Sequence, residues 1–219
     1  AEERDRILQI GHIERFNPVM RELEAKLNHP KFIESHRLSP FPNRSIDIGV
    51  VLDLMIHDLE IILHLVKSPV ASIDAVGVPV LMKSEDIANA RLRFENGCVA
   101  NITSSRISMK NMRKSRFFQK DAYISVDYLD KTCEVVKMKE APEVPGDFDM
   151  ILQNAEGDRK QIYFNNPEVS HNNAILDELE TFADAINNNT TPIVTLEDGT
   201  EALRVAYMII DSMEKNKTI

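Results

Sequence analysis

The segment Gly49-Val-Val-Leu-Asp-Leu-Met-Ile-His-Asp-Leu-Glu-Ile-Ile-Leu-His-Leu-Val66 predicts a buried helix that carries a polar stripe. Four of its polar residues are spaced by four, three and four positions, so at about 3.6 residues per turn they share one face: Asp53, His57, Glu60 and His64. Nearly every other residue is apolar, and a buried helix carries charge only where that charge has a partner. A carboxylate and an imidazole one turn apart can orient each other and move a proton near neutral pH.

Three interpretations of the stripe remain open. Asp53 and His57 could form a structural ion pair, the stripe could line a pocket, or Asp53, His57 and Glu60 could bind a metal. Four polar groups are more than one structural pair needs, which favours the pocket. The metal site is disfavoured because neither a His-Glu-x-x-His motif nor a cysteine cluster accompanies the stripe.

Composition places the chain among ordinary globular proteins. Its 219 residues fit one large domain or two small ones, with 43% hydrophobic and 28% charged residues. A net charge of -9 argues against broad binding to nucleic acid or anionic membranes. No signal peptide or membrane-spanning run is evident. Cys98 and Cys133 belong to no Cys-x-x-Cys pair, so we expect reduced thiols in a cytoplasmic protein.

The residues before the striped helix predict three elements. Arg4–Ile13 is expected to be a short buried strand. Asn17 as N-cap and Pro18 at the first helical position predict a helix that ends near Asn28. Pro30–Arg44 should be extended, with breaks at its later prolines.

The rest of the chain predicts a run of strands followed by two helices. The expected strands are Val70–Leu81, Asp86–Glu95, Cys98–Ile107, Ser115–Gln119, Ala122–Tyr128, Cys133–Met138 and Arg159–Phe164. Asn96-Gly97 is a strong hairpin signal, and Glu140–Gly157 should be a loop. Helices are expected over Asn173–Asn187 and Leu196–Lys215, the second capped by Thr195. This order predicts an α+β fold, an open and largely antiparallel sheet with helices on one face, whose other face is polar or meets a partner.

The segment Gly11-His-Ile-Glu-Arg-Phe-Asn-Pro18 gathers polar groups between a predicted strand and a helix. His12, Arg15 and Asn17 could reach a ligand there. An ordinary strand-to-helix connection with a capping Asn would have the same composition, so composition does not separate the two interpretations.

Both segments resemble one family. Gly49-x3-Asp53-x-Met-x-His57-x2-Glu60 resembles the Gly-x3-Asp-x-Gly-x-His-x2-Asp signature of the Gfo/Idh/MocA family of NAD(P)-dependent sugar oxidoreductases. Gly11–Pro18 is similar to the segment that follows that family's nucleotide-binding domain, and the order of elements matches its C-terminal domain. Within the family, the two motifs are most similar to the UDP-N-acetylglucosamine 3-dehydrogenase group.

The chain departs from the family in what it lacks. It has neither a Gly-x-Gly-x-x-Gly loop nor a Lys-Pro pair, and it begins at Ala1 rather than Met. We therefore expect residues 1–219 to be one substrate-binding and oligomerisation domain, with 1–15 as its junction to an absent N-terminal Rossmann domain. That domain would hold most of the NAD or NADP, so this chain alone should be inactive. Met55 replaces the signature's second Gly and Glu60 its final Asp, which leaves the role of Glu60 open.

The resemblance implies roles for particular residues. His57 would be the general base that takes a proton from a sugar hydroxyl, and Asp53 would orient or polarise His57 or the substrate. His171 and Asn172 would contact the sugar, together with His12, Arg15 and Asn17. The open sheet face would join copies of the chain into a homo-oligomer.

Some features keep two interpretations. His64 is expected to be structural. The basic stretch Arg106–Lys120 could be a solvated hairpin or an oligomer contact, or it could attract a nucleotide-sugar diphosphate. The chain as a whole could instead be a non-catalytic assembly or sugar-binding module, and a metal-dependent sugar isomerase or hydrolase is a further alternative.

Overall fold

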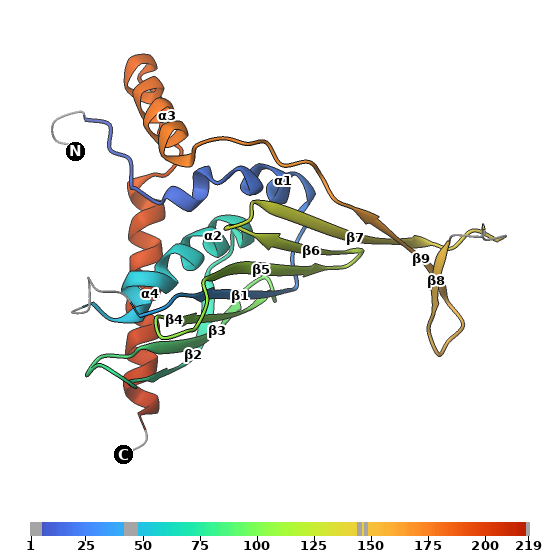
Figure 1. The fold of residues 1–219 in the computed structure, drawn as a ribbon, viewed down its shortest axis with the longest axis horizontal. Helices are drawn as coiled ribbons and strands as arrows, with labels where there is room; N and C mark the ends of the chain where they lie inside the picture. Colours follow the sequence, from blue (N-terminus) through green and yellow to red (C-terminus); the bar gives the residue numbers. More distant parts are fainter. Residues whose placement is uncertain (1–5, 42–47, 144–145, 147–148, 218–219) are drawn as a thin grey trace.

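A nine-stranded mixed sheet organises the chain (Figure 1). The computed structural model describes residues 6–41, 48–143, 146 and 149–217. Across the sheet, the strands of this described part follow the order β2 (Val70–Val78), β3 (Ile87–Phe94), β4 (Val99–Ser105), β1 (Phe32–Leu38), β5 (Met112–Gln119), β6 (Ala122–Asp127), β7 (Thr132–Glu140), β9 (Arg159–Asn165) and β8 (Met150–Gln153). β1 and β4 pair in parallel, and the other pairs are antiparallel. The predicted open, largely antiparallel sheet is confirmed.

The helices lie on one side of this sheet (Figure 1). They are the short 3₁₀ turn η2 (Ile13–Phe16), α1 (Pro18–Lys26), the π-helical turn η3 (Val51–Met55), α2 (Ile56–Val66), α3 (Ala174–Asn188) and α4 (Leu196–Asn216). α4 packs on β2, α2 packs on α4, and α1 packs on β6 and β7, whereas α3 contacts η2. The core lies between these helices and the sheet.

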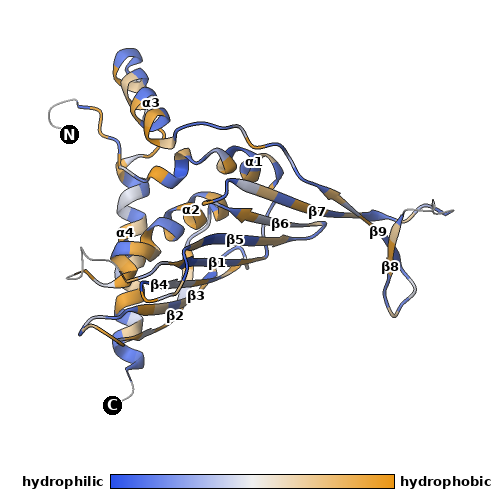
Figure 2. Cartoon of the chain, in the orientation of Figure 1, coloured by the Kyte–Doolittle hydropathy of each residue, from blue (hydrophilic) through white to orange (hydrophobic). Residues whose placement is uncertain are grey.

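Alternation along β1 shows how the two faces differ. Ile33, Ser35 and Arg37 are buried on the helix side, while Glu34 and His36 are partly exposed on the open side. Because successive side chains of a strand point to opposite faces, this register places Arg37 under the helices. The other end of the sheet projects away from the helices, and apolar colour continues onto β8 there (Figure 2).

Two sequence-based expectations about elements need correction, and a third is confirmed in part. Arg6–His12, the described part of the predicted Arg4–Ile13 strand, form no strand, because their backbone pairs with the segment before α4 (Ile10 N to Val194 O, 3.1 Å) and not with the sheet. Pro30–Arg44 is extended as expected over its central strand β1, and its residues 42–44 lie outside the described part. The predicted loop Glu140–Gly157 contains β8, which pairs with β9.

The predicted helix and hairpin ends are confirmed. The Asn17 side chain caps α1 with Pro18 at its first position, and Asn173 caps α3. Thr195 and Asp198 form a reciprocal capping box at α4. Gly97 adopts φ 83 between β3 and β4, the left-handed conformation that this hairpin turn requires.

Candidate functional site

Two histidines from separate segments meet beside the start of α2. His12 precedes η2 and is 7% exposed, and His57 lies in the first turn of α2 and is half-buried. Their rings pack edge to face with centroids 6.1 Å apart. Among the described residues, neither buried Nδ1 atom has a hydrogen-bond partner. Buried polar atoms are nearly always paired, so these two ring nitrogens stand out as unsatisfied hydrogen-bonding groups.

A buried guanidinium lies next to these rings. Arg37 Nε donates to Asp58 Oδ2 (2.6 Å), and Arg37 Nη1 donates to Glu14 Oε1 (3.0 Å). Ser35 Oγ donates to the other oxygen of Asp58 (3.0 Å). All four side chains are buried, and ionic groups tolerate such burial only when they are paired and hydrogen-bonded as here.

Electrostatics keep both rings neutral. Burial, followed by the positive charge of Arg37, lowers the pKa of His57 to about 4. Burial also lowers the pKa of His12, against the opposing effect of Glu60. Burial alone would raise the pKa of Glu14, but Arg37 lowers it below its usual range. At neutral pH the site therefore presents uncharged imidazoles together with the ionised Glu14 carboxylate, and such a ring can accept a proton.

The predicted contact between Asp53 and His57 does not occur as a hydrogen bond or ion pair among the described residues. Asp53 is half-buried in η3, a π-helical turn, whereas His57 belongs to regular α-helix. A π-helical turn bonds residue i to i+5, so positions four apart across it no longer stack as in an α-helix. The carboxylates that face His57 are instead Asp58 and Glu14.

Glu60, the third residue of the stripe, has a structural partner. Arg15 Nη2 forms a buried ion pair with Glu60 Oε1. The same nitrogen lies 3.9 Å from Asp198 in the first turn of α4. This arrangement ties η2, α2 and α4 together. His64 Nε2 lies 2.9 Å from Glu24 Oε1 of α1, as expected for a structural residue.

Of the residues predicted to contact a ligand, three line one cavity and two do not. Arg15, Asn17 and Asn172 line one cavity of about 460 Å³, next to α1 and the start of α3. Asn17 is also committed to structure, because its Oδ1 caps α1 and its Nδ2 donates to Tyr128 O (3.0 Å). His171 is exposed, and neither it nor His12 is among the residues that line the cavity.

Comparisons with known proteins agree with this architecture. The profile of the Gfo/Idh/MocA oxidoreductase family, C-terminal alpha/beta domain, matches residues 37–219. The chain belongs to this family. It is 41% identical over 147 residues to a UDP-N-acetylglucosamine 3-dehydrogenase from Acidithiobacillus ferrooxidans, an alignment that covers 67% of this chain and 47% of that protein.

Two further comparisons show similar proteins. The chain is 25% identical over 179 residues to a myo-inositol 2-dehydrogenase from Thermotoga maritima, which covers 78% of this chain and 48% of that protein. A solved structure of the Acidithiobacillus enzyme superposes with a TM-score of 0.85 and 32% identity, over 98% of this chain and 65% of that one. The chain thus spans about half the length of the curated relatives it matches.

In this family member, the basic stretch Arg106–Lys120 is largely paired within the chain. Arg106 is fully buried and donates to Asp86 (2.9 Å) and to Ile48 O (2.6 Å), just before η3. Three further cations of the stretch pair with acids: Arg113 with Glu14, Lys114 with Asp127 and Arg116 with Glu34. These four cations neutralise the protein's own acids, which leaves little free charge for a diphosphate.

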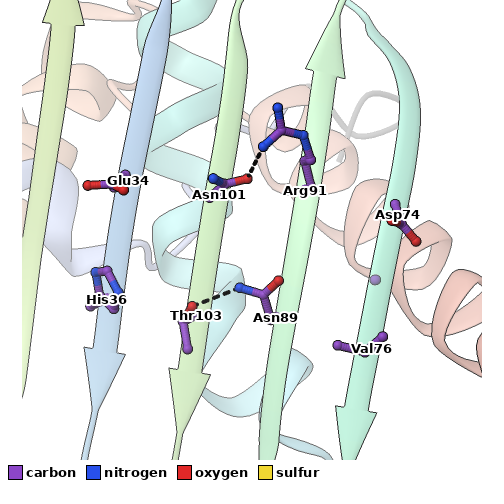
Figure 3. Close-up of a pocket in the computed structure, with 9 residues that line it drawn as sticks. Glu34, His36, Asp74, Val76, Asn89, Arg91, Asn101 and Thr103 are labelled. Atoms are coloured by element: carbon purple, nitrogen blue, oxygen red, sulfur yellow. Dashed lines mark hydrogen bonds between the residues drawn. The ribbon is translucent and has the colours of Figure 1, made fainter.

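The open face of the sheet carries a different polar surface (Figure 3). A cavity of about 480 Å³ lies across the strands, lined by Glu34, His36, Asp74, Ala75, Val76, Asn89, Arg91, Asn101 and Thr103. Cross-strand bonds join its members: Arg91 to Asn101 (3.0 Å) and Asn89 to Thr103 (2.9 Å). Apart from Ala75, which packs into the core, these side chains belong to the face opposite the helices and so to a surface separate from the two histidines.

Reasoning from sequence missed Arg37, Asp58 and Glu14. Because Phe32–Leu38 carries polar residues on both faces, alternation along the strand did not mark Arg37 as buried. Among the described residues, no group of three or more His, Cys, Asp or Glu could hold a metal ion. Both cysteines are free and buried. In the described part, no helix has the length and apolar character needed to cross a membrane.

Proposed function

We propose that this chain forms the sugar-binding and proton-accepting half of an NAD(P)-dependent dehydrogenase that acts on a nucleotide-activated amino sugar. The observation that carries the proposal is the half-buried, neutral imidazole of His57 with its buried and unpartnered Nδ1. The relative named UDP-N-acetylglucosamine 3-dehydrogenase supports the substrate class. The family supports the reaction class, an oxidation.

His57 is the general base in this proposal. It takes the proton of a hydroxyl on a ring carbon as that carbon loses hydride, and the carbinol becomes a ketone. Burial and Arg37 lower the pKa of His57, so the ring is in the accepting form at neutral pH. Asp53, half-buried one turn earlier, polarises or orients the substrate, since it does not hydrogen-bond His57 among the described residues.

In this proposal the nucleotide sugar is bound by the predicted contact residues His12, Arg15, Asn17, His171 and Asn172. Arg15, Asn17 and Asn172 line a cavity large enough for part of such a ligand. His12 and His171 lie outside that lining, and in this proposal they contact the sugar from beyond it. Arg15 would offer nitrogens that its ion pair with Glu60 leaves free.

The nicotinamide, when bound, supplies the hydride acceptor. Its fit to these residues rests on the unpartnered ring nitrogens at the site. The dinucleotide itself is held mainly outside this chain, because the sequence has no glycine loop that could cradle a diphosphate. The chain alone therefore binds substrate and provides the base, and as an isolated module it does not turn over. Copies of the chain associate through the open sheet face.

The test is oxidation of UDP-N-acetylglucosamine by the protein expressed from its complete reading frame, followed as NADH or NADPH formation. We expect His57→Ala to lower kcat by about 10²- to 10⁴-fold, the range of a positioned base. His29→Asn is the matched control, because His29 lies in the turn after α1 with φ 50, which Asn tolerates. Equal activity of His57→Ala and the control would refute the proposal.

A further inference from the structure

The two histidines lie on separate elements, and no single helix or strand contains both of them. His12 precedes η2 near the start of the chain, and His57 lies in α2. Their relative placement depends on tertiary contacts between the two segments. Each histidine has a buried carboxylate close in sequence, Glu14 two residues after His12 and Asp58 directly after His57.

One side chain binds both carboxylates. Arg37 rises from the central strand β1 and contacts Asp58 through Nε (2.6 Å) and Nη2 (3.4 Å). Through Nη1 it contacts Glu14 (3.0 Å). Arg37 is 3% exposed, so these bonds form out of water, where charge-assisted hydrogen bonds are strong.

We propose that Arg37 is a positioning residue, which cross-links η2 to α2 through Glu14 and Asp58 and thereby holds His12 and His57 edge to face. The importance of Arg37 for turnover rests on the proposed function above. Its effect on the relative position of the His12 and His57 rings is independent of that function. Arg37 touches neither substrate nor the reacting atoms in this role. The planar fork of a guanidinium is what lets one residue span two carboxylates.

The surroundings of His57 include charges from three elements. Arg37 faces it from β1, Asp58 from α2, and Glu14 and His12 from the segment around η2. Removing Arg37 takes away the positive charge, leaves the buried Asp58 without a cation and leaves Glu14 with Arg113 as its cation. The lost positive charge and the unpaired Asp58 both favour protonation of His57, so the pKa of His57 rises when the guanidinium is lost.

Arg113 provides the matched control. Its Nη1 binds the same Glu14 oxygen at the same 3.0 Å, yet the residue is half-exposed and does not contact Asp58 among the described bonds. Arg113→Gln therefore removes a guanidinium from Glu14 and leaves the cross-link between η2 and α2 in place.

The experiment is histidine NMR on the chain, with the cross-relaxation peak between the His12 and His57 rings as the readout. We expect the peak in the parent and in Arg113→Gln, and its loss in Arg37→Gln and in Arg37→Lys. Arg37→Gln should also raise the pKa of His57, whereas Arg37→Lys keeps the charge and should raise it less. An unchanged peak in both Arg37 variants would refute the proposal that Arg37 cross-links η2 to α2. Loss of the peak in Arg37→Gln but not in Arg37→Lys would refute it as well.

A second variant covers the case in which Arg37→Gln does not fold. Glu14→Gln keeps an acceptor but removes its charge, and should weaken the peak while the bond between Arg37 and Asp58 persists. In the full-length enzyme, Arg37→Lys should lower kcat with little change in KM. If the NMR result holds but His57→Ala leaves turnover intact, the proposed function fails and the positioning role stands.

Discussion

The His57 ring lies where protonation is unfavourable, and this has a consequence for stability. Its pKa falls from 6.5 to about 4 on folding, through burial and the charge of Arg37. The unfolded chain therefore binds more protons between those pH values. The stability contributed by the neutral ring is complete above about pH 6.5 and is lost as the pH falls toward about 4.

We expect His57→Asn to flatten the dependence of stability on pH in that window. In the parent, protonation of His57 lowers the free energy of unfolding by an amount on the order of 2 kcal/mol across this window, and His57→Asn should abolish that decrease. Each pKa unit is worth about 1.4 kcal/mol, and the partial exposure of the ring reduces the effect. Urea midpoints between pH 4 and pH 7 measure it. A slope identical to that of the parent, with His29→Asn as the control, would show that His57 does not titrate as described.

Among individual residues, His12 and His57 could be predicted from the sequence, but the charged residues around them could not. The stripe on the 49–66 helix identified His57, and the Gly11–Pro18 motif identified His12. Arg37 was hidden because Phe32–Leu38 carries polar residues on both of its faces, so alternation did not show which polar side was buried. Its partners, Glu14 and Asp58, are distant in sequence, and only the fold brings them together.

At the scale of elements, helix caps and turns could be predicted from nearby residues, whereas the pairing of distant strands could not. Caps and turns act within a few residues, so Asn17, Thr195 and Asn96-Gly97 could be interpreted correctly from sequence. β1 is central because it pairs with β4 and β5, which lie far along the chain. β8 was hidden in a Pro- and Gly-containing segment and forms because β9 offers it an edge.

The start of α4 depends on such a local signal. The Thr195 hydroxyl accepts a bond from the Asp198 backbone, and the Asp198 side chain accepts one from the Thr195 backbone. Thr195→Ala should cost about 1 kcal/mol of unfolding free energy, and Thr195→Ser should restore most of it. Urea denaturation measures both. Thr191→Ala, at an exposed loop position before the helix, is the control, and an equal loss there would rule out the capping box as the cause.

At the scale of the whole molecule, the helices leave one face of the sheet uncovered (Figure 1). An apolar row crosses that face in register, from Phe32 and Phe118 through Tyr123 and Val136 to Phe164 on β9. Its first three rings are in contact, with centroids 5.8 Å and 5.1 Å apart. Beside it lies the polar surface of Figure 3, which carries acidic side chains (Glu34 and Asp74) and the basic side chain of Arg91. A face with both charges and an apolar row can be self-complementary across a two-fold axis.

We expect the chain to self-associate through this face and Phe164→Asp to weaken the association about tenfold or more. Phe164 is 62% exposed, so the substitution adds charge to the row without emptying the core. Leu179→Asp is the matched control, since Leu179 is 60% exposed on α3, away from the open face. Sedimentation velocity over a range of concentrations measures both variants. A monomeric parent would show that the chain does not self-associate. Dissociation by Leu179→Asp and not by Phe164→Asp would place the contact on another face. Loss of association with an unchanged fold in Phe164→Asp alone would assign the interface to the open face.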